Sequence, residues 1–566
     1  MGGLPLDDSP DLSPRQRQIL DLLRAGKVNK EIASELGIGL GTVKQHMVAI
    51  FKKLKVRNRA AAVSCDLQRG ATPASQEWSM FGGSLLERRP CVVLSLLLPG
   101  DGPESLDEPG RTQALMRLLH QSLAACAFDH DAVFLARQQG AGDLIFGIRG
   151  ASMQDVHRAV LAARLVHRAV RAHDPVLAER LQGALSAGLA VISINRRGAW
   201  SGEAMASAAI AEARDLAASA LPGGLKFSPG ACRLMRALGP VPVGPFSGEC
   251  SFSTVDGLSW QEMDAGVGSW ELHDRDQEIR QVLAWLTAAR DQGPGVLALE
   301  GEIGMGKSAL CRGLVRRIEV QGLVVRHAFV QQDLEGPVIR SLPHGGQIDL
   351  AALFESEASS VVHPGPDIVI LDDADLLDAT RLAALIDRAQ RCACPLLLAG
   401  RRFPDHLFDE GQTVRLKRLS PAGTLALMRA LLSDDGAGAM LPEAVCQALA
   451  DQALGVPLFA RELAQAAREG GEPAFLPLPL RQAIAARLDP MGLDRPLLRH
   501  VAHGAGEGKT VRTGAELAME IGVLPEHLPS LVEQAVSAGV LRRDEFGGLG
   551  FAHPLLRQAI LNSEMC

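Results

Sequence analysis

The residues best suited to chemistry form a glycine-rich run near the middle of the chain. An apolar segment at 296–299 leads into the run 301–308, GEIGMGKS, and a helix-forming segment follows. Glycines let backbone N–H groups wrap a phosphate that also lies at the amino end of the following helix. The lysine would reach the β and γ oxygens, and the serine hydroxyl would bind Mg²⁺. We call this run the phosphate loop; its candidate nucleotide-binding residues are Gly301, Gly304, Gly306, Lys307 and Ser308.

Two acidic residues close a second apolar segment about sixty residues further on. The run 368–371, IVIL, has the composition of a buried strand and is followed by Asp372 and Asp373. We expect Asp372 to hold Mg²⁺ through water and Asp373 to polarise the water that attacks the γ-phosphate. An acidic turn after a core strand is the alternative interpretation.

Another buried strand is expected where the apolar run CPLLLAGRR leads to Arg401 and Arg402. Either guanidinium would contact the γ-phosphate of a bound nucleotide, and an ordinary surface arginine is the alternative. A long amphipathic helix, RDQEIRQVLAWLTAAR, precedes the strand at 296–299. The alternation of helices and apolar strands predicts an α/β domain around the phosphate loop.

A different, purely helical pattern occupies the first sixty residues. Ser13, the proline after it and Gln16 combine a capping hydroxyl, a first-turn proline and a capping-box partner. A second short helix is expected at 29–37, and a third opens at Thr42 with apolar residues on one face and basic residues on the other. The apolar stripe of this third helix consists of Val43, Met47, Ile50, Phe51 and Leu54. Two short helices joined by a glycine-containing turn indicate a helix-turn-helix.

The net charge of −7 is unevenly distributed along the chain. Between Ser13 and Arg59, eleven Lys and Arg oppose three Asp and Glu, a local charge of +8 that leaves −15 on the remainder. The basic segment would attract a polyanion that the acidic remainder repels, so nucleic acid is its expected partner. A solvated charged face is the alternative interpretation.

The runs LSPRQRQIL, NKEIASELGI and TVKQHMVAIFKKLKVRNR resemble the LuxR-type DNA-binding domain over about fifty residues. The resemblance implies a scaffold helix at 29–37 and a recognition helix at 42–54. We expect Lys44 and Gln45 nearest to base edges and the later basic residues at phosphates. The DNA-binding candidates are Thr42, Lys44, Gln45, His46, Lys52, Lys53, Arg57 and Arg59. A three-helix module that docks a protein is the alternative.

Short apolar strands alternate with helices between about residues 90 and 240. We expect a strand at 92–98, an amphipathic stretch at 111–126 and helices at 152–173 and 203–220, which suits an α/β sandwich. This order of elements resembles the class III nucleotidyl cyclase domain, with GAGDLIFGI, LSAGLAV and ALPGGLKFS at corresponding places.

The cyclase resemblance lacks most of the residues that the reaction needs. Cyclase chemistry uses two carboxylates to hold a pair of Mg²⁺ ions. Asp143 is one candidate, but the resemblance places Leu97 at the other carboxylate position. It also places Ala211 and Asp215 where an amide and a cation are expected. We therefore expect a non-catalytic relative used for dimerisation or sensing, in which Asp143 is a turn residue.

The segments GEIGMGKS, VILDDADLLD, LLLAGRR, GVPLFARELA and FAHPLLRQAI together resemble the STAND-type AAA-like ATPases of large LuxR-family regulators, over 271–566. The resemblance implies that Pro457 of a Gly-x-Pro segment borders the adenine and that His553 of a winged helix approaches bound ADP. From the sequence alone, Pro457 starts a helix and His553 is a capping or packing residue. Asp274 stands where the family has a glycine.

The predicted fold class is multidomain. We expect an all-α helix-turn-helix domain, an α/β cyclase-like sandwich and an α/β P-loop NTPase with helical and winged-helix subdomains. The expected order is the helix-turn-helix at 10–65, a linker at 66–89, the sandwich at 90–240, a linker at 241–270, the ATPase domain at 271–415, the helical subdomain at 416–475 and the winged-helix-like subdomain at 476–566.

These patterns together predict a DNA-binding transcriptional regulator switched by ATP. The composition, 47% hydrophobic and 22% charged, excludes a largely disordered chain. The sequence has no long apolar run and no signal-peptide pattern, so we expect a cytoplasmic protein without a membrane partner. ATP binding and slow hydrolysis would control self-association, with ATP, ADP and Mg²⁺ as cofactors, double-stranded DNA as partner and a protein or small molecule as inducer. An active cyclase and a nucleotide-dependent protein scaffold are the rival hypotheses.

Overall fold

In the computed structural model the chain forms two compact units, Met1–Gly83 and Ser84–Cys566. In the first unit the structure describes residues 15–16, 18–20, 46–47 and 50. In the second it describes residues 85–564 apart from 99–108, 138–139, 204, 239–240, 244–250, 253–258, 262–271, 294, 334–335, 343–346, 356–365, 405–406, 409, 434–441, 469–475 and 506–509.

All of the described residues in the first unit are helical. Ile19 and Leu20 lie on the expected first helix, and Met47 and Ile50 lie on the expected recognition helix. All four side chains are fully buried. The burial of Met47 and Ile50 fits the predicted apolar stripe of the third helix, because residues three apart on a helix face the same side.

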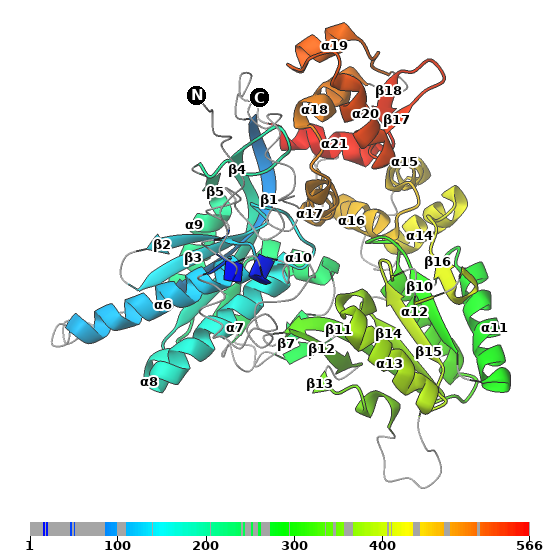
Figure 1. The fold of residues 1–566 in the computed structure, drawn as a ribbon, viewed down its shortest axis with the longest axis horizontal. Coiled ribbons are helices and arrows are strands. Elements are labelled where there is room, and N and C mark those ends of the chain that lie inside the picture. The colour runs from blue at the N-terminus through cyan, green and yellow to red at the C-terminus, as the bar shows by residue number, and fades with distance from the viewer. Residues whose placement is uncertain are drawn as a thin grey trace, which may run out of the picture. The chain divides into compact units, whose positions relative to one another are not determined.

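The second unit begins with an α/β domain, which we call the central domain (Figure 1). Its sheet has the order β2-β3-β1-β4-β6-β8, and β5 pairs with β4. The strands are β1 (Leu85–Leu97), β2 (Val133–Arg137), β3 (Ala141–Phe146), β4 (Gln182–Ile194), β5 (Ala206–Ser207), β6 (Leu225–Phe227) and β8 (Ser251–Phe252). The helices are α6 (Pro109–Asp129), α7 (Asp155–His173), α8 (Pro175–Ala178), α9 (Ala208–Ala218) and α10 (Pro229–Leu238). The strands β7 (Val241–Val243) and β9 (Ser259–Gln261) pair separately.

Strand β1 carries the core of the central domain on both of its faces. Val92 and Leu94 lie on one face of the strand and Cys91 and Val93 lie on the other, because side chains alternate along a strand. Val92 and Leu94 pack in the cluster that includes residues of α6, α7 and α10, whereas Cys91 and Val93 pack with residues of α9. The predicted sandwich of helices and sheet is therefore present. The strand starts at Leu85, seven residues before the expected start, because its charged first half pairs with β4 as far as Ile194.

A second sheet, with the order β13-β12-β11-β14-β15-β10-β16, lies where the sequence predicts the ATPase domain. Its strands are β10 (Val296–Glu300), β11 (Val325–Asp333), β12 (Gly336–Ser341), β13 (Gln347–Ile348), β14 (Ile368–Asp372), β15 (Leu396–Gly400) and β16 (Thr413–Arg415). The helices are α11 (Asp276–Gln292), α12 (Lys307–Glu319) and α13 (Ala379–Arg391), and the 3-10 turns are η3 (Ala352–Phe354), η4 (Ala374–Leu376) and η5 (Glu410–Gln412).

The five strands from β11 to β16 in this order are parallel. Every residue of β14 and β15 is buried, as expected for a parallel sheet covered on both faces. Parallel strands end at one edge, where open α/β sheets bind their ligands. This edge therefore gathers the ends of β10, β14 and β15, which are the three segments predicted to carry the nucleotide chemistry.

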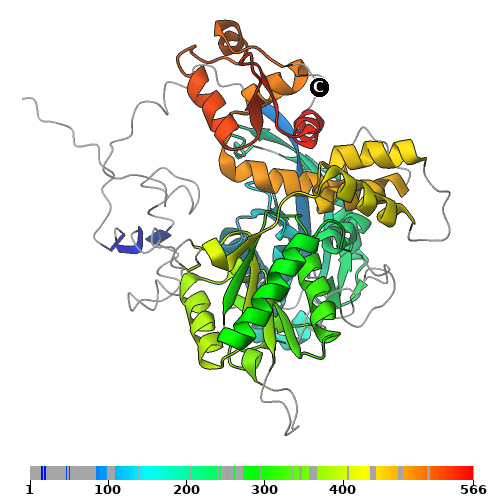
Figure 2. The same ribbon diagram turned by 90° about the vertical axis from the view of Figure 1, so that its right-hand side faces the viewer.

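The remaining residues form one helical core with a two-stranded hairpin. The elements are α14 (Pro421–Ser433), α15 (Glu443–Ala453), α16 (Pro457–Arg468), α17 (Leu478–Leu488), η6 (Asp489–Met491), α18 (Arg495–Gly504), α19 (Ala515–Glu520), α20 (Leu528–Ser537), β17 (Leu541–Arg543), β18 (Leu549–Phe551) and α21 (Pro554–Ser563). In two perpendicular views, the yellow-to-orange helices α14 to α17 lie between the green ATPase sheet and the orange-red elements from α18 to α21 (Figures 1 and 2).

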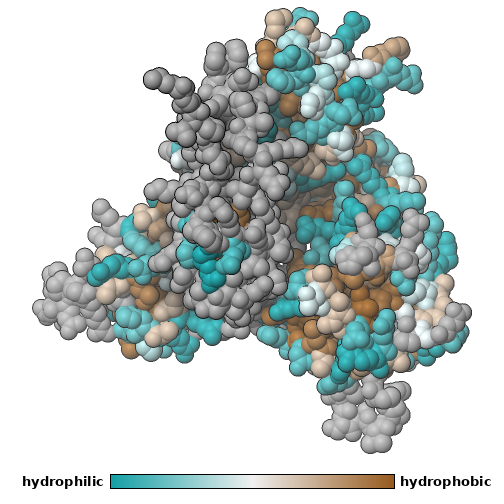
Figure 3. Space-filling model, viewed as in Figure 1, coloured by the Kyte–Doolittle hydropathy of each residue, from teal (hydrophilic) through white to brown (hydrophobic). Residues whose placement is uncertain are grey.

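Hydrophilic residues cover much of the described surface on the face drawn in Figure 3, including the region of α18 to α20. Several apolar side chains of these helices pack inside, for example Leu498, Ala518 and Val532, whereas Met519 of α19 is exposed. In the part of the chain that the structure describes, no helix is both long and apolar enough to cross a bilayer.

Candidate nucleotide site

The phosphate loop joins β10 to α12, as the sequence predicts. Gly304 and Gly306 have φ angles of +82° and +89°, in the left-handed region that favours glycine. A β-carbon on Gly304 would also lie 2.8 Å from the β-carbon of Leu458. Helix α12 begins at Lys307, so its first free N–H groups face the loop. The backbone therefore forms the anion cradle that the motif implies.

Lys307 is buried inside this loop, with 9% of its surface exposed. Its Nζ donates to the carbonyl oxygens of Gly301 at 2.8 Å and Glu302 at 3.2 Å. Both acceptors are neutral, and within the described residues no carboxylate pairs with the ammonium. A buried cation held only by carbonyls is costly, and phosphate oxygens would supply the missing negative charge. Lys307 therefore fits a nucleotide phosphate, with Ser308 half-buried beside it on the first turn of α12.

Asp372 ends β14, and Asp373 follows it in a left-handed conformation with φ of +51°. Asp372 is 5% exposed, and its Oδ1 accepts the N–H of Asp373 at 2.9 Å. Burial, with the negative charges of Asp372 and Asp375 in addition, raises the pKa of Asp373 to about 8. The charges of Lys307 and Arg401 oppose this shift, which places both cations near the acids.

The donor set at this edge fits Mg²⁺ together with a nucleotide, because oxygen ligands and excess negative charge are what a hard divalent cation prefers. No group of three His, Cys, Asp or Glu in the described residues is arranged as a metal centre by itself. The ion would therefore need oxygens from the phosphates and from Ser308 as well as from Asp372.

Arg401 follows β15 and stands at the rim of the site. Its Nε donates to Oδ2 of Asp375 at 2.8 Å, and 59% of its side chain is exposed. Arg401 is therefore an ion-paired residue that would have to leave Asp375 to reach a γ-phosphate. Arg402, the alternative candidate, is exposed.

Helix α16 starts at Pro457, directly against the phosphate loop. The N–H of Leu458 donates to the carbonyl oxygen of Gly304 at 3.1 Å. The Cγ of Pro457 lies 3.7 Å from the point where a β-carbon on Gly306 would stand. Gly455 has φ of +79°, and a β-carbon there would lie 2.4 Å from the carbonyl oxygen of Leu419. The Gly455-Val-Pro457 segment is thus part of the wall of the loop.

His553 caps α21 and reaches the same helix α16. Its Nδ1 accepts the N–H of Leu555 at 3.1 Å, and its ring meets Phe459 edge-on with 5.5 Å between centroids. Burial lowers its pKa to about 4, with the positive charges of Arg418 and Arg487 adding to the effect. The ring is neutral at pH 7, and its proton lies on Nε2 because Nδ1 is an acceptor.

Two cations at this site were not predicted. Arg275 is 4% exposed and donates to the carbonyl oxygens of Lys417 at 2.8 Å and Met305 at 3.0 Å, which ties the start of α11 to the phosphate loop. Arg487 of α17 pairs with Glu302 of the loop at 3.6 Å. The sequence signal next to Arg275 was Asp274, which stands where the family has a glycine. Asp274 has φ of +55°, the conformation for which a glycine is usual, and it accepts the N–H of Ser420.

Asp143 is not a turn residue, contrary to our expectation. It lies inside β3, opposite Ser95 of β1, and is fully buried. Its Oδ2 accepts two hydrogen bonds from Arg214, at 2.9 and 2.7 Å, and its Oδ1 accepts one from Arg137 at 3.3 Å. Paired strands and two guanidiniums explain its position, since a buried carboxylate needs both charge and hydrogen bonds. Its oxygens are thus already used by the protein.

The other residues that the cyclase resemblance singled out lie on β1 and α9. Leu97 pairs with Ala141, and Ala211 and Asp215 are exposed on α9. Most of the DNA-binding candidates lie outside the described residues, namely Thr42, Lys44, Gln45, Lys52, Lys53, Arg57 and Arg59. His46 is described and is helical and half-buried.

Two family models match this chain. Residues 10–65 match the bacterial regulatory proteins of the luxR family, and residues 271–345 match the AAA ATPase domain. The chain carries a LuxR-family helix-turn-helix domain. It also carries an AAA ATPase domain, whose matched segment contains the phosphate loop. The multidomain fold class and both assignments agree with the sequence predictions.

Curated relatives of this chain include two transcriptional regulators that each match a tenth of its length. The putative HTH-type transcriptional regulator YhjB of Escherichia coli is 47% identical over 57 residues, which are 10% of this chain and 28% of that protein. The transcriptional regulatory protein DesR of Bacillus subtilis is 41% identical over 59 residues, 10% of this chain and 30% of that one. The chain thus spans less than a third of the length of these relatives.

Similar solved structures include the guanylyl cyclase Cya2, at 15% identity and a TM-score of 0.22, over 31% of this chain and 93% of that chain. Domain III of the replication initiation protein DnaA of Thermotoga maritima has 15% identity and a TM-score of 0.25, over 37% of this chain and 90% of that one.

Proposed function

We propose that this protein is a transcriptional regulator whose DNA binding is switched by ATP. The LuxR-family domain would bind double-stranded DNA, and the AAA domain would bind ATP or ADP. The observation that carries the proposal is the contact of Leu458 with Gly304, because it attaches the helical subdomain to the phosphate loop itself. A nucleotide that fills the loop would change this contact and so alter the subdomain.

The residues of the site have distinct roles in this proposal. Lys307 binds the β and γ phosphates, and Ser308 and Asp372 hold Mg²⁺, which would neutralise phosphate charge. Asp373 orients the attacking water. The nucleotide site is completed by the glycines of the loop and by Arg401, Pro457 and His553.

Two nucleotides can act as a switch only if they bind differently to two conformations. We propose an ADP-bound resting state and an ATP-bound state that self-associates and binds DNA, with slow hydrolysis between them. Arg401 would distinguish the two nucleotides, because only a γ-phosphate could compete with Asp375 for its guanidinium. An inducer, a small molecule or a protein, would bias the same equilibrium, and the setting would be the cytoplasm.

The central domain has no catalytic role in this proposal. The carboxylate of Asp143 is held by Arg137 and Arg214, so it is a structural ion pair rather than a metal ligand. The rival hypothesis of an active cyclase lacks a second carboxylate beside Asp143 in the described residues. The rival hypothesis of a protein scaffold does not account for the basic charge of the LuxR-family domain.

Calorimetry and sedimentation test the nucleotide part of the proposal. Lys307→Ala should weaken ATP binding strongly and abolish nucleotide-dependent self-association, since it removes the cation that contacts the phosphates. The matched control is Lys226→Ala, which changes a lysine of the central domain that donates to Ser219. Unchanged ATP affinity in Lys307→Ala with an intact fold would refute the proposed switch.

A further inference from the structure

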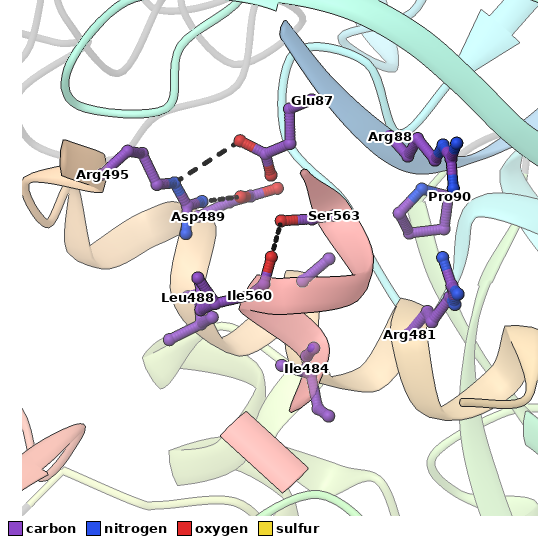
Figure 4. Close-up of a pocket in the computed structure, with 12 residues that line it drawn as sticks. Glu87, Arg88, Pro90, Arg481, Ile484, Leu488, Asp489, Arg495, Ile560 and Ser563 are labelled. Atoms are coloured by element: carbon purple, nitrogen blue, oxygen red, sulfur yellow. Dashed lines mark hydrogen bonds and ion pairs between the residues drawn. The ribbon is translucent and has the colours of Figure 1, made fainter. Parts of the chain in front are cut away.

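A cavity with an excess of positive charge lies where the central domain meets α17 and α21 (Figure 4). Its apolar wall comes from both helices, including Ile484, Leu488 and Ile560. Its polar lining contains three arginines, Arg88, Arg481 and Arg495, but only two carboxylates, Glu87 and Asp489.

The two carboxylates are already paired with Arg89 and Arg495 rather than with Arg481. Asp489 pairs with Arg89 at 3.1 Å and with Arg495 at 2.9 Å. Glu87 lies 3.8 Å from each of the same two guanidiniums. Two acids and two bases therefore balance at one end of the cavity, and the positive charge of Arg481 remains at the other.

Arg481 is buried without an acidic partner. It is 9% exposed, and it donates from Nε to the carbonyl oxygen of Leu476 at 3.0 Å and from Nη1 to that of Asn562 at 3.4 Å. No carboxylate pairs with it among the residues that the structure describes. Burial and the nearby charge of Arg88 both lower its pKa, so the guanidinium is poorly compensated where it stands. Figure 4 shows Arg88, Pro90 and Arg481 on the same side of the cavity.

We propose that this cavity binds a small oxyanion, a carboxylate or phosphate group, which pairs with Arg481 beside Arg88. A guanidinium presents N–H groups in a planar fork that matches two oxygens of such a group. The cavity volume of about 30 Å³ holds two or three water-sized groups. It therefore suits one acidic head group rather than an entire nucleotide.

The cavity is connected to the nucleotide site through one helix. Helix α17 carries Arg481 in the cavity, and its Arg487 pairs with Glu302 of the phosphate loop. An oxyanion that fixes α17 would thus act as an effector of nucleotide binding, and this part of the inference depends on the proposed function. Binding of the oxyanion itself does not depend on it.

Thermal unfolding of the full-length protein tests the site. The protein is saturated with ADP and Mg²⁺ to occupy the phosphate loop, and sodium phosphate or sodium acetate is added in separate arms while NaCl holds the ionic strength constant. We expect a saturable rise in the unfolding midpoint, in the phosphate arm, the acetate arm or both, and the responding arm identifies the kind of head group. Arg481→Met should weaken this binding about ten- to a hundredfold.

The controls separate this site from the phosphate loop. Arg542→Met, which replaces an exposed arginine of β17, should keep the full response. In chloride alone, Arg481→Met should unfold at the same temperature as the wild type or higher, because it removes a buried, uncompensated charge. No response in either arm, or a response that Arg481→Met retains, overturns the site, whatever the fate of the proposed switch. The anion of the responding arm should also change the ADP affinity of the wild type but not of Arg481→Met, and an affinity that changes equally in both proteins or in neither overturns the effector role.

Discussion

Arg89 of β1 and Asp489 of η6 are 400 positions apart in the sequence, and their Nη2 and Oδ1 atoms lie 3.1 Å apart. Arg89 is 1% exposed and also donates to the carbonyl oxygens of Ile148 and Gly198. Close by, Arg196 pairs with Asp494 at 3.0 Å. Buried ion pairs therefore join the central domain to the segment that follows α17. Helix α17 in turn contacts the phosphate loop, because its Arg487 pairs with Glu302.

Removing Asp489 should destabilise this junction strongly. Asp489→Ala leaves both Arg89 and Arg495 buried with only the more distant carboxylate of Glu87 nearby, and such a loss costs about 3–5 kcal/mol. Denaturant unfolding followed by tryptophan fluorescence measures the change. Glu533→Ala, which breaks an exposed pair with Arg543, is the control and should change little. A loss in Asp489→Ala no greater than in this control would show that the pair does not stabilise the junction.

Asp155 of α7 accepts a hydrogen bond from Gln482 of α17 at 2.7 Å, and this contact should make the junction less stable as the pH rises from about 4 to 7. Burial raises the pKa of Asp155 to about 7; the negative charge of Asp489 adds to this, and the N–H of Ser152, the charge of Arg158 and the amide of Gln482 oppose it. The native state thus keeps a proton that the unfolded state releases near pH 4. The stabilisation from Asp155 is complete below that pH and is lost as the pH rises towards 7.

Asp155→Asn keeps the shape of the side chain and cannot titrate. Between pH 4 and 7 the wild type should lose stability relative to this variant, at a slope of up to about 1.4 kcal/mol per pH unit. Urea unfolding of both proteins at several pH values measures the difference. Parallel stability curves would contradict the raised pKa.

The central domain should make no cyclic nucleotide. The oxygens of Asp143 are occupied by Arg214 and Arg137, and Leu97 cannot bind a metal. Full-length protein incubated with ATP or GTP and Mg²⁺ or Mn²⁺ should give no product above background in a chromatographic assay. Product that disappears in Asp143→Ala would restore the cyclase hypothesis.

DNA contacts should divide into two kinds within the LuxR-family domain. Lys44→Ala should cost about 1–3 kcal/mol on the specific site and little on other sequences, because it is expected near a base edge. Arg57→Ala should lower the salt slope by about one unit on every sequence, because it is expected at a phosphate. Salt titrations with specific and random duplexes measure both. Equal losses on both duplexes for Lys44→Ala would remove it from sequence recognition.

Local patterns explain what the sequence could predict. The phosphate loop, the strand that ends at Asp372, the helix start at Pro457 and the burial of Met47 and Ile50 each depend on residues close together in the chain. Spacing and periodicity report such features directly.

The remaining features depend on contacts between distant segments. Nothing near Asp143 in the sequence identifies Arg214 as its partner, and nothing near Glu302 identifies Arg487. The charged residues around Arg89 resemble the end of a linker, because arginine is seldom buried unless it is paired. Its partner Asp489 is known only once the chain has folded.

The decisive measurement for an ATP switch is the affinity for DNA in each nucleotide state. Fluorescence anisotropy would measure the affinity of full-length protein for its specific duplex, with ATP and Mg²⁺ or with ADP and Mg²⁺, in the wild type and in Lys307→Ala. We expect the wild type to bind about 5- to 150-fold more tightly with ATP than with ADP, and Lys307→Ala to bind equally with either nucleotide. Equal affinity of the wild type in both nucleotides, or an unchanged ATP response in Lys307→Ala, would contradict the proposed switch.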